Sequence, residues 1–172
     1  MSVPIYVIDT SYLCEIAGCD GYSQPDASKE VRKRFKKAMN QGGRFFVPLP
    51  CLFELGDHIA DVKHEEKRTK LAEWLRETVT QCLEKSKPWT ITPAQSPADV
   101  LPSLMARFVP LAGKQKIGLV DAFTESEAKR LKANFKDRKG RVHIWTNDAA
   151  LKKLEPDEET NPYLWKADGT PR

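Results

Sequence analysis

Four acidic residues stand where a folded chain could bring them together: Asp9, Glu54, Asp121 and Asp148. Asp9 and Asp148 each follow a short apolar run, whereas Glu54 and Asp121 lie near the start of segments with helical periodicity. In a parallel α/β sheet, strand ends and the starts of the following helices share one edge. Four carboxylates at one edge repel one another unless cations compensate them, and hard oxygen ligands select Mg²⁺ or Mn²⁺. The pattern therefore predicts a site for one or two such ions, which suits phosphodiester cleavage.

Each of the four acids also has a purely structural interpretation. Asp9 precedes Thr10 and Ser11, a sequence typical of a turn or a helix N-cap, and Asp148 could cap a short helix. An acid in the first turn of a helix, such as Asp121, is favoured by the helix dipole. Glu54 alone would be an ordinary exposed helix glutamate. Both interpretations stay open at this point.

The elements that must position these acids follow from hydrophobic patterns. The apolar, β-branched run from Ile5 to Ile8 predicts a strand buried on both faces. Further strands are predicted at 44–48, 89–91 and 141–148. Helices are predicted at 12–16, 26–41 (with Asp26 as the cap), 50–62, 65–87, 101–109 (ending before Pro110), 119–135 and 149–154. This alternation of strand and helix is typical of the α/β class with a central, mostly parallel sheet flanked by helices.

Length and composition restrict the class of protein. The chain has 172 residues with 40% hydrophobic content, which suits one domain with a real core. A net charge of +4 and a pI near 8.8 are compatible with an anionic partner. No apolar run approaches a membrane span or a signal peptide, so we expect a cytoplasmic protein that does not bind membranes. The four cysteines form no CxxC pair and the histidines no finger pattern, so a zinc site is not expected.

The helix predicted at 26–41 carries a run of basic residues on one side. Such a run is either a solvated helix face or a contact for nucleic acid, and the sequence leaves both open. If RNA is bound, the candidate contacts are Lys29, Arg32, Lys33 and Lys36, together with Arg130 and Arg138 later in the chain. A glycine-rich stretch at 113–118 lacks the Lys-Ser/Thr of a phosphate-binding loop and is rejected as one.

The surroundings of the four acids resemble the motifs of the PIN-domain ribonuclease family, which includes the VapC-like toxin endoribonucleases. An apolar strand ending in Asp, followed by Thr or Ser, matches IYVIDTS, and a Glu on the helix after the second strand matches VPLPCLFELGDHI. An Asp opening a later helix matches GLVDAFTESEAKRL, and a strand ending in T-N-D matches IWTNDAAL. The four motifs stand in the family's order and span most of the chain.

The resemblance implies a fold, an activity and a set of roles. The fold is a PIN-like three-layer α/β/α domain over 1–154, containing an extended helical and proline-broken segment at 65–117 and followed by a C-terminal tail at 155–172. The activity is cleavage of RNA by a hydrolase that uses Mg²⁺ or Mn²⁺. Asp9, Asp121 and Asp148 would be metal ligands, and Glu54 would hold a second ion or orient the attacking water. The residues expected to hydrogen-bond these carboxylates or a phosphate are Thr10, Ser11, Thr146 and Asn147.

Partners and neighbouring residues are less constrained. RNA is the expected partner, and small stand-alone members of the family are often toxins inhibited by an antitoxin. A cognate antitoxin and a second copy of the chain therefore stay open as protein partners. Asp57 and Glu125 are expected to face solvent. The segment at 65–117 is longer than in compact toxin members, and the sequence does not decide whether Tyr163 to Trp165 adds an edge strand or packs on the surface.

Two other classes of function compete with a nuclease. A catalytically inactive PIN-like module would bind RNA or protein, although the presence of all four acids argues against a degenerate site. A phosphatase of the haloacid-dehalogenase type would need a second Asp two residues after Asp9, where Ser11 stands. A receiver domain would need an early acidic pair and a late lysine, and neither is evident. We therefore expect a nuclease first, a binding module second and a phosphoryl-aspartate chemistry last.

Overall fold

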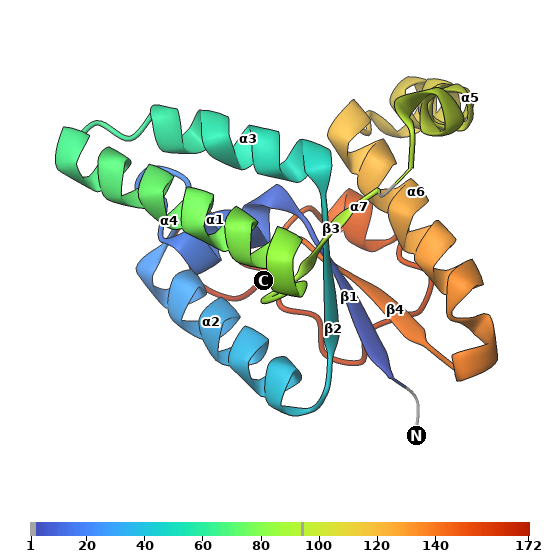
Figure 1. The fold of residues 1–172 in the computed structure, drawn as a ribbon, viewed down its shortest axis with the longest axis horizontal. Coiled ribbons are helices and arrows are strands. Elements are labelled where there is room, and N and C mark those ends of the chain that lie inside the picture. Colours follow the sequence, from blue (N-terminus) through green and yellow to red (C-terminus); the bar gives the residue numbers. More distant parts are fainter. Residues whose placement is uncertain (1–2, 94) are drawn as a thin grey trace.

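The computed structural model describes residues 3–93 and 95–172, without the side chain of Arg138, and Figure 1 shows its fold. The strands are β1 (Pro4–Ile8), β2 (Arg44–Pro48), β3 (Thr90–Thr92) and β4 (Arg141–Trp145). The helices are α1 (Thr10–Ala17), α2 (Pro25–Asn40), α3 (Leu49–Ala60), α4 (Glu65–Lys85), α5 (Pro97–Gln115), α6 (Leu119–Asn134) and α7 (Ala149–Lys152). Each strand predicted from sequence is present, which confirms the alternation of strand and helix.

The four strands form one parallel sheet in the order β3-β2-β1-β4. The chain runs from β1 outward through β2 to β3 and then returns to place β4 on the other side of β1. The strand order therefore reverses between β1 and β4, and this kind of switch point is where open α/β sheets bind ligands at the carboxyl ends of their strands. Asp9 directly follows β1, and its backbone N–H donates to the carbonyl of Trp145, the last residue of β4 (3.0 Å).

Alternate residues of the strands face two separate cores. Ile5 and Val7 pack with residues of α6, whereas Ile8 belongs to the core that contains residues of α1, α2, α3 and α4. In β2, Phe46 belongs to the first core and its neighbour Val47 to the second. Because side chains of a strand alternate between faces, a strand buried on both faces reads as an unbroken apolar run.

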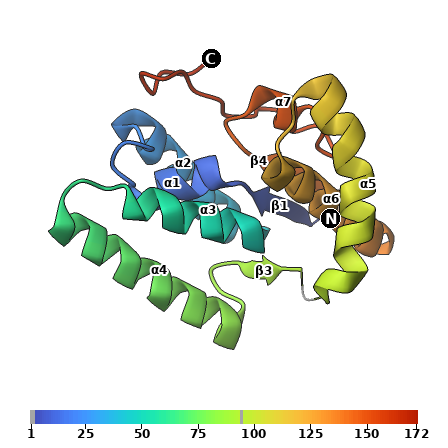
Figure 2. The ribbon, with the colours of Figure 1, turned by 90° about the horizontal axis from the view of Figure 1, so that it is seen from above.

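The helices are divided between the two faces of the sheet. Figure 1 shows α1, α2, α3 and α4 on one side and α5 and α6 on the other, and Figure 2 shows the same division from above. The helices that connect β1 to β2 and β2 to β3 cover one face, and those between β3 and β4 cover the other. The predicted three-layer α/β/α architecture is therefore confirmed. None of the helices in residues 3–93 and 95–172 is long and apolar enough to cross a membrane.

Two helix predictions were wrong at their ends. α5 runs from Pro97 to Gln115 rather than over 101–109, so both Pro102 and Pro110 lie inside it. An internal proline costs roughly 3 kcal/mol, but α5 is capped by Ser96 and packs on α6 through a small core that offsets this cost. α2 begins at Pro25 instead of being capped by Asp26, because proline is well suited to the first helical position.

The C-terminal tail is neither an edge strand nor a loose surface segment. Tyr163 and Trp165 are buried and belong to the core on the α1–α4 face. The hydroxyl of Tyr12 donates to the carbonyl of Tyr163 (2.8 Å), and the backbone N–H of Trp165 donates to Asn147 Oδ1 (2.7 Å). The tail therefore completes a core and is tied to the loop that follows β4.

Candidate active site at the carboxyl edge of the sheet

Asp9 is the centre of the site because it ends the central strand. Its side chain is only 6% exposed, and its Oδ2 accepts hydrogen bonds from the hydroxyls of Ser11 and Thr146, both at 2.9 Å. Burial raises the pKa of Asp9, and the two hydroxyl donors oppose that rise. Asp9 also caps α1, since the Ser11 N–H points at the same oxygen (3.4 Å). One oxygen is thus fixed from three directions.

Thr146 links Asp9 to Asp148 across the neighbouring strands β1 and β4. While its hydroxyl donates to Asp9, the same oxygen accepts from the backbone N–H of Asp148 (3.0 Å). Asp148 is exposed and caps α7 with Oδ1, which accepts from the N–H groups of Ala150 (2.6 Å) and Leu151 (3.0 Å). The cap fixes the direction of the Asp148 side chain at the same edge of the sheet.

Glu54 is joined to this corner by the residue that follows Asp9. It lies on α3, one and a half turns from the helix start, and is half-buried. The Thr10 hydroxyl donates to Glu54 Oε2 (2.5 Å). Because Thr10 is the first residue of α1, this hydrogen bond holds the carboxylate from α3 beside the end of β1.

Asp121 shows that the four acids lie within electrostatic reach of one another. It occupies the first turn of α6, where its Oδ2 accepts from the Gly118 N–H (3.3 Å). Burial raises its pKa to about 6, with further rises from the charges of Asp9, Asp148 and Glu54 against the lowering effect of the Gly118 N–H. No lysine or arginine is among these main influences. The edge of the sheet thus carries an excess of negative charge.

The remaining oxygens of these carboxylates are available to a cation. In the described part of the chain, no hydrogen bond engages Oδ1 of Asp121, Oδ2 of Asp148 or Oε1 of Glu54. Oδ1 of Asp9 has only the distant thiol of Cys51 (3.9 Å). Four carboxylates with free oxygens and no compensating cation are a donor set that fits Mg²⁺ or Mn²⁺. Among the described residues, no group of three or more His, Cys, Asp or Glu is already arranged to hold a metal ion.

Asn147 and Glu125 have structural partners. Asn147 donates its backbone N–H to the Ser11 hydroxyl (2.9 Å), but its side-chain oxygen is taken by Trp165 of the tail. Glu125 was expected to face solvent and this was wrong: it is buried, with ion pairs to Arg107 (2.8 Å) and Lys129 (2.5 Å). The charge could be buried because two cations pair with it.

The candidate RNA contacts do not gather at the carboxylates. Lys29, Lys33 and Lys36 are exposed along α2, whose last turn leads into the start of β2, at the end of the sheet opposite Asp9. Arg32 donates to the carbonyl of Ile16 (3.0 Å). On the other face of the sheet, Arg130 forms a bidentate ion pair with Glu127. The side chain of Arg138 lies outside the described ones.

One buried residue beside the carboxylates, Cys51, has no signal in the sequence. Cys51 lies on the first turn of α3 with its thiol 3.9 Å from Asp9 Oδ1 and 3.5 Å from the Thr124 hydroxyl. Burial raises the pKa of Cys51, and the charge of Asp9 raises it further, so it is a neutral thiol that fills space under the site. A cysteine in an apolar helix start gave no hint of this position. Asp57, in contrast, is exposed as predicted.

Compared with known proteins, the sequence matches no family model and no curated protein sequence. The resemblance to PIN-domain ribonucleases therefore depends on the four motifs and their order.

Proposed function

We propose that this protein is a metal-dependent endoribonuclease whose site is formed by Asp9, Glu54, Asp121 and Asp148. The observation that carries the proposal is the set of hydrogen bonds through Thr10 and Thr146 that holds Glu54, Asp9 and Asp148 at the switch point of the sheet. The raised pKa of Asp121 supports it, because burial and the charges of the three other carboxylates raise that pKa. An uncompensated cluster of this kind is costly to the fold unless a cation neutralises it. The resemblance to PIN-domain ribonucleases supports RNA as the substrate.

The residues at this edge divide into ligands and the groups that orient them. Asp9, Asp121 and Asp148 would hold Mg²⁺ or Mn²⁺ through the oxygens that are not used as helix caps. A bound ion of this kind lowers the pKa of water and stabilises negative charge on a phosphate. Ser11 and Thr146 fix Asp9, because both hydroxyls donate to its Oδ2. Its Oδ1 has only the distant thiol of Cys51.

Glu54 has a different task because it is not a helix cap. Thr10 holds one of its oxygens, so the other can accept a proton from a water or hold a second ion. Because Thr10 directly follows Asp9 in the chain, its hydroxyl positions the Glu54 carboxylate relative to Asp9.

The test is a cleavage assay with fluorescent single-stranded and structured RNA, in Mg²⁺, in Mn²⁺ and in excess EDTA. We expect cleavage that requires a divalent ion and falls by at least about a hundredfold in Asp9→Asn and Asp121→Asn. Asp57→Asn is the matched control, because Asp57 is an exposed acid on the same helix as Glu54. Equal cleavage by wild type and Asp9→Asn would refute the assigned site.

The same assay separates the nuclease from a non-catalytic module. RNA binding without cleavage under every metal condition would show a module that binds RNA and would refute the proposed activity. Cleavage of single-stranded DNA at the same rate as RNA would support the assigned site but would contradict the proposed preference for RNA.

A further inference from the structure

A second concave site lies at the opposite edge of the sheet from the four carboxylates. It is a cavity of about 790 Å³ between α2 and α4, with the first residues of β2 and β3 at its base, among them Arg44, Phe45 and Thr90. Asp9 lies at the other end of these parallel strands, roughly 13 Å away for four residues at ~3.3 Å each. The volume is within the usual range for a small-molecule pocket. This cavity is therefore separate from the proposed active site.

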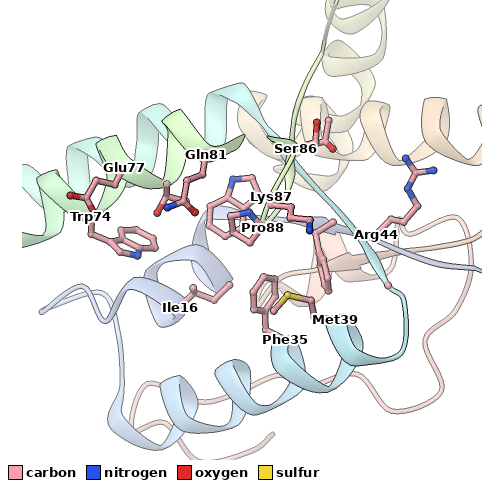
Figure 3. Close-up of a pocket in the computed structure, with 15 residues that line it drawn as sticks. Ile16, Phe35, Met39, Arg44, Trp74, Glu77, Gln81, Ser86, Lys87 and Pro88 are labelled. Carbon is pink, nitrogen blue, oxygen red and sulfur yellow. The ribbon is translucent and has the colours of Figure 1, made fainter. Parts of the chain in front are cut away.

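The walls of the cavity are aromatic faces. Phe35 extends from α2 and Trp74 from α4 toward the same space, as Figure 3 shows. Trp89 also lines the cavity, and its ring meets that of Phe35 edge-on at 6.2 Å. Trp74 has no aromatic ring partner among the described residues. Part of its side chain packs against the core, and the part that lines the cavity is left for a ligand. Opposed aromatic side chains of this kind take up a planar ring by stacking.

Polar groups beside these rings suit the edge of a heteroaromatic ring. Gln81 of α4 points into the same space and offers both an amide donor and an acceptor (Figure 3). A ring with donors and acceptors along one edge is a nucleobase.

The charges around the cavity favour an anion attached to that ring. Lys87 lines the cavity and is exposed. Arg44 also lines the cavity, but its guanidinium lies over the ring of Phe135 (4.8 Å). Glu77 is the carboxylate among the lining residues. The lining therefore carries one net positive charge, and Lys87 is the cation that is available to a phosphate group.

We propose that this cavity binds a nucleotide: a nucleobase stacked on Trp74 beside Phe35, with its phosphate near Lys87. The nucleotide could be free or could be one residue of a single-stranded RNA, because the chemistry of recognition is the same. The proposal does not depend on cleavage at the carboxylates.

The test uses the tryptophans that line the cavity as reporters, in EDTA so that the carboxylates bind no metal. Intrinsic fluorescence is followed while AMP, UMP, adenosine, uridine or inorganic phosphate is added to the full chain. We expect the monophosphates to quench Trp74 and Trp89 saturably, the nucleosides to bind at least about fivefold more weakly, and phosphate alone to give no quenching. If neither monophosphate quenches the fluorescence, or if nucleoside and nucleotide bind equally well, the proposal is overturned.

Variants assign the binding to this cavity. Because base stacking on an aromatic side chain is worth about 1–3 kcal/mol, Trp74→Ala should raise the calorimetric Kd for AMP or UMP about fivefold to a hundredfold. Lys87→Glu should weaken binding. It should also reduce the slope of log Kd against log salt concentration by about 1, as expected for the loss of one phosphate contact. Lys85→Glu, two residues away and outside the cavity lining, is the matched control and should bind like wild type. An effect of Lys85→Glu equal to that of Lys87→Glu would overturn the site.

An oligonucleotide distinguishes the two sources of the nucleotide. If an RNA strand is the ligand, a single-stranded hexamer should compete with AMP and bind at least about tenfold more tightly than the monomer. If the ligand is a free nucleotide, the hexamer should bind no better than AMP. Hexamer binding that is unaffected by Trp74→Ala and does not displace AMP would place the RNA elsewhere and leave only the free nucleotide at this cavity.

Discussion

Replacing Asp121 by Asn should make the metal-free protein more stable at neutral pH. Asp121 is the acid on which the repulsion of Asp9, Asp148 and Glu54 acts, and burial adds to the penalty on its charge. Asn keeps the size of the side chain and an oxygen that can accept from the Gly118 N–H, so the cap of α6 is retained. The substitution therefore removes a charge with little other change. A residue that lowers stability where it stands is expected at a functional site rather than in a purely structural cap.

The size of the effect follows from the raised pKa. The pKa of Asp121 rises from 3.8 to about 6, and at ~1.36 kcal/mol for each pKa unit this is about 3 kcal/mol. The side chain is only partly buried, so solvent screening reduces the expected gain to about 1–2 kcal/mol. Because the folded state holds this proton more tightly than the unfolded chain, wild type loses stability as pH rises from about 4 to about 6. Asp121→Asn lacks this loss.

The assay is urea unfolding followed by tryptophan fluorescence in EDTA, at pH 4 and at pH 7. The free energies of unfolding of wild type and Asp121→Asn should be similar at pH 4 and differ by about 1–2 kcal/mol in favour of the variant at pH 7. Asp57→Asn should differ from wild type by less than about 0.5 kcal/mol at both pH values. Added Mg²⁺ or Mn²⁺ should stabilise wild type more than Asp121→Asn. A variant that is equally or less stable at pH 7 would refute the proposed charge cluster.

Three further predictions concern the groups around the site. Thr146→Val removes the donor to Asp9 and leaves the Asp148 N–H without its acceptor, so it should cost about 1–3 kcal/mol in urea unfolding, and Thr146→Ser should restore most of it. Burial would raise the pKa of Glu125, but its ion pairs with Arg107 and Lys129 prevail and lower it. The stability that Glu125 contributes should therefore be lost as pH falls below about 4.5, its unfolded value. Glu125→Gln should give a flatter pH profile of unfolding in that range. Trp165→Ala should lower the free energy of unfolding by about 3–5 kcal/mol, because Trp165 is buried in the main core, whereas a solvent-exposed tail would give no measurable change.

Local patterns predicted the fold well where one residue type has one physical use. The apolar run from Ile5 to Ile8 has a single explanation, a strand between two cores, and β1 is at the centre of the sheet. The strand at Arg44–Pro48 was predicted to the residue. Prolines were misleading, because Pro102 and Pro110 are read as breaks, whereas packing of α5 on α6 compensates for both. Local propensity does not contain that compensation.

The contacts between distant segments could not be predicted from the sequence. In the sequence, Glu125 is indistinguishable from an exposed helix acid. Its partner Arg107 comes from α5, and the short helix expected at 101–109 gave no reason to place Arg107 against α6. Trp74 belongs to an apolar stripe that predicts a packed helix face, yet α4 leaves a cavity between itself and α2. Cys51 gains its position under Asp9 only from the approach of α3 to β1. Each of these depends on how elements pack, not on a local pattern.

The structural and chemical interpretations of the acids are not alternatives. Asp9, Asp121 and Asp148 all use one carboxylate oxygen to hold a helix start, as their local sequences predict. A carboxylate has two oxygens, so a cap that fixes one also orients the other. The three helices α1, α6 and α7 begin at the same edge of the sheet, so each cap holds its carboxylate at that edge. Removing the negative charge while keeping the cap, as Asp→Asn does, separates the two roles: stability should be kept or gained, and any activity that needs a metal ion should be lost.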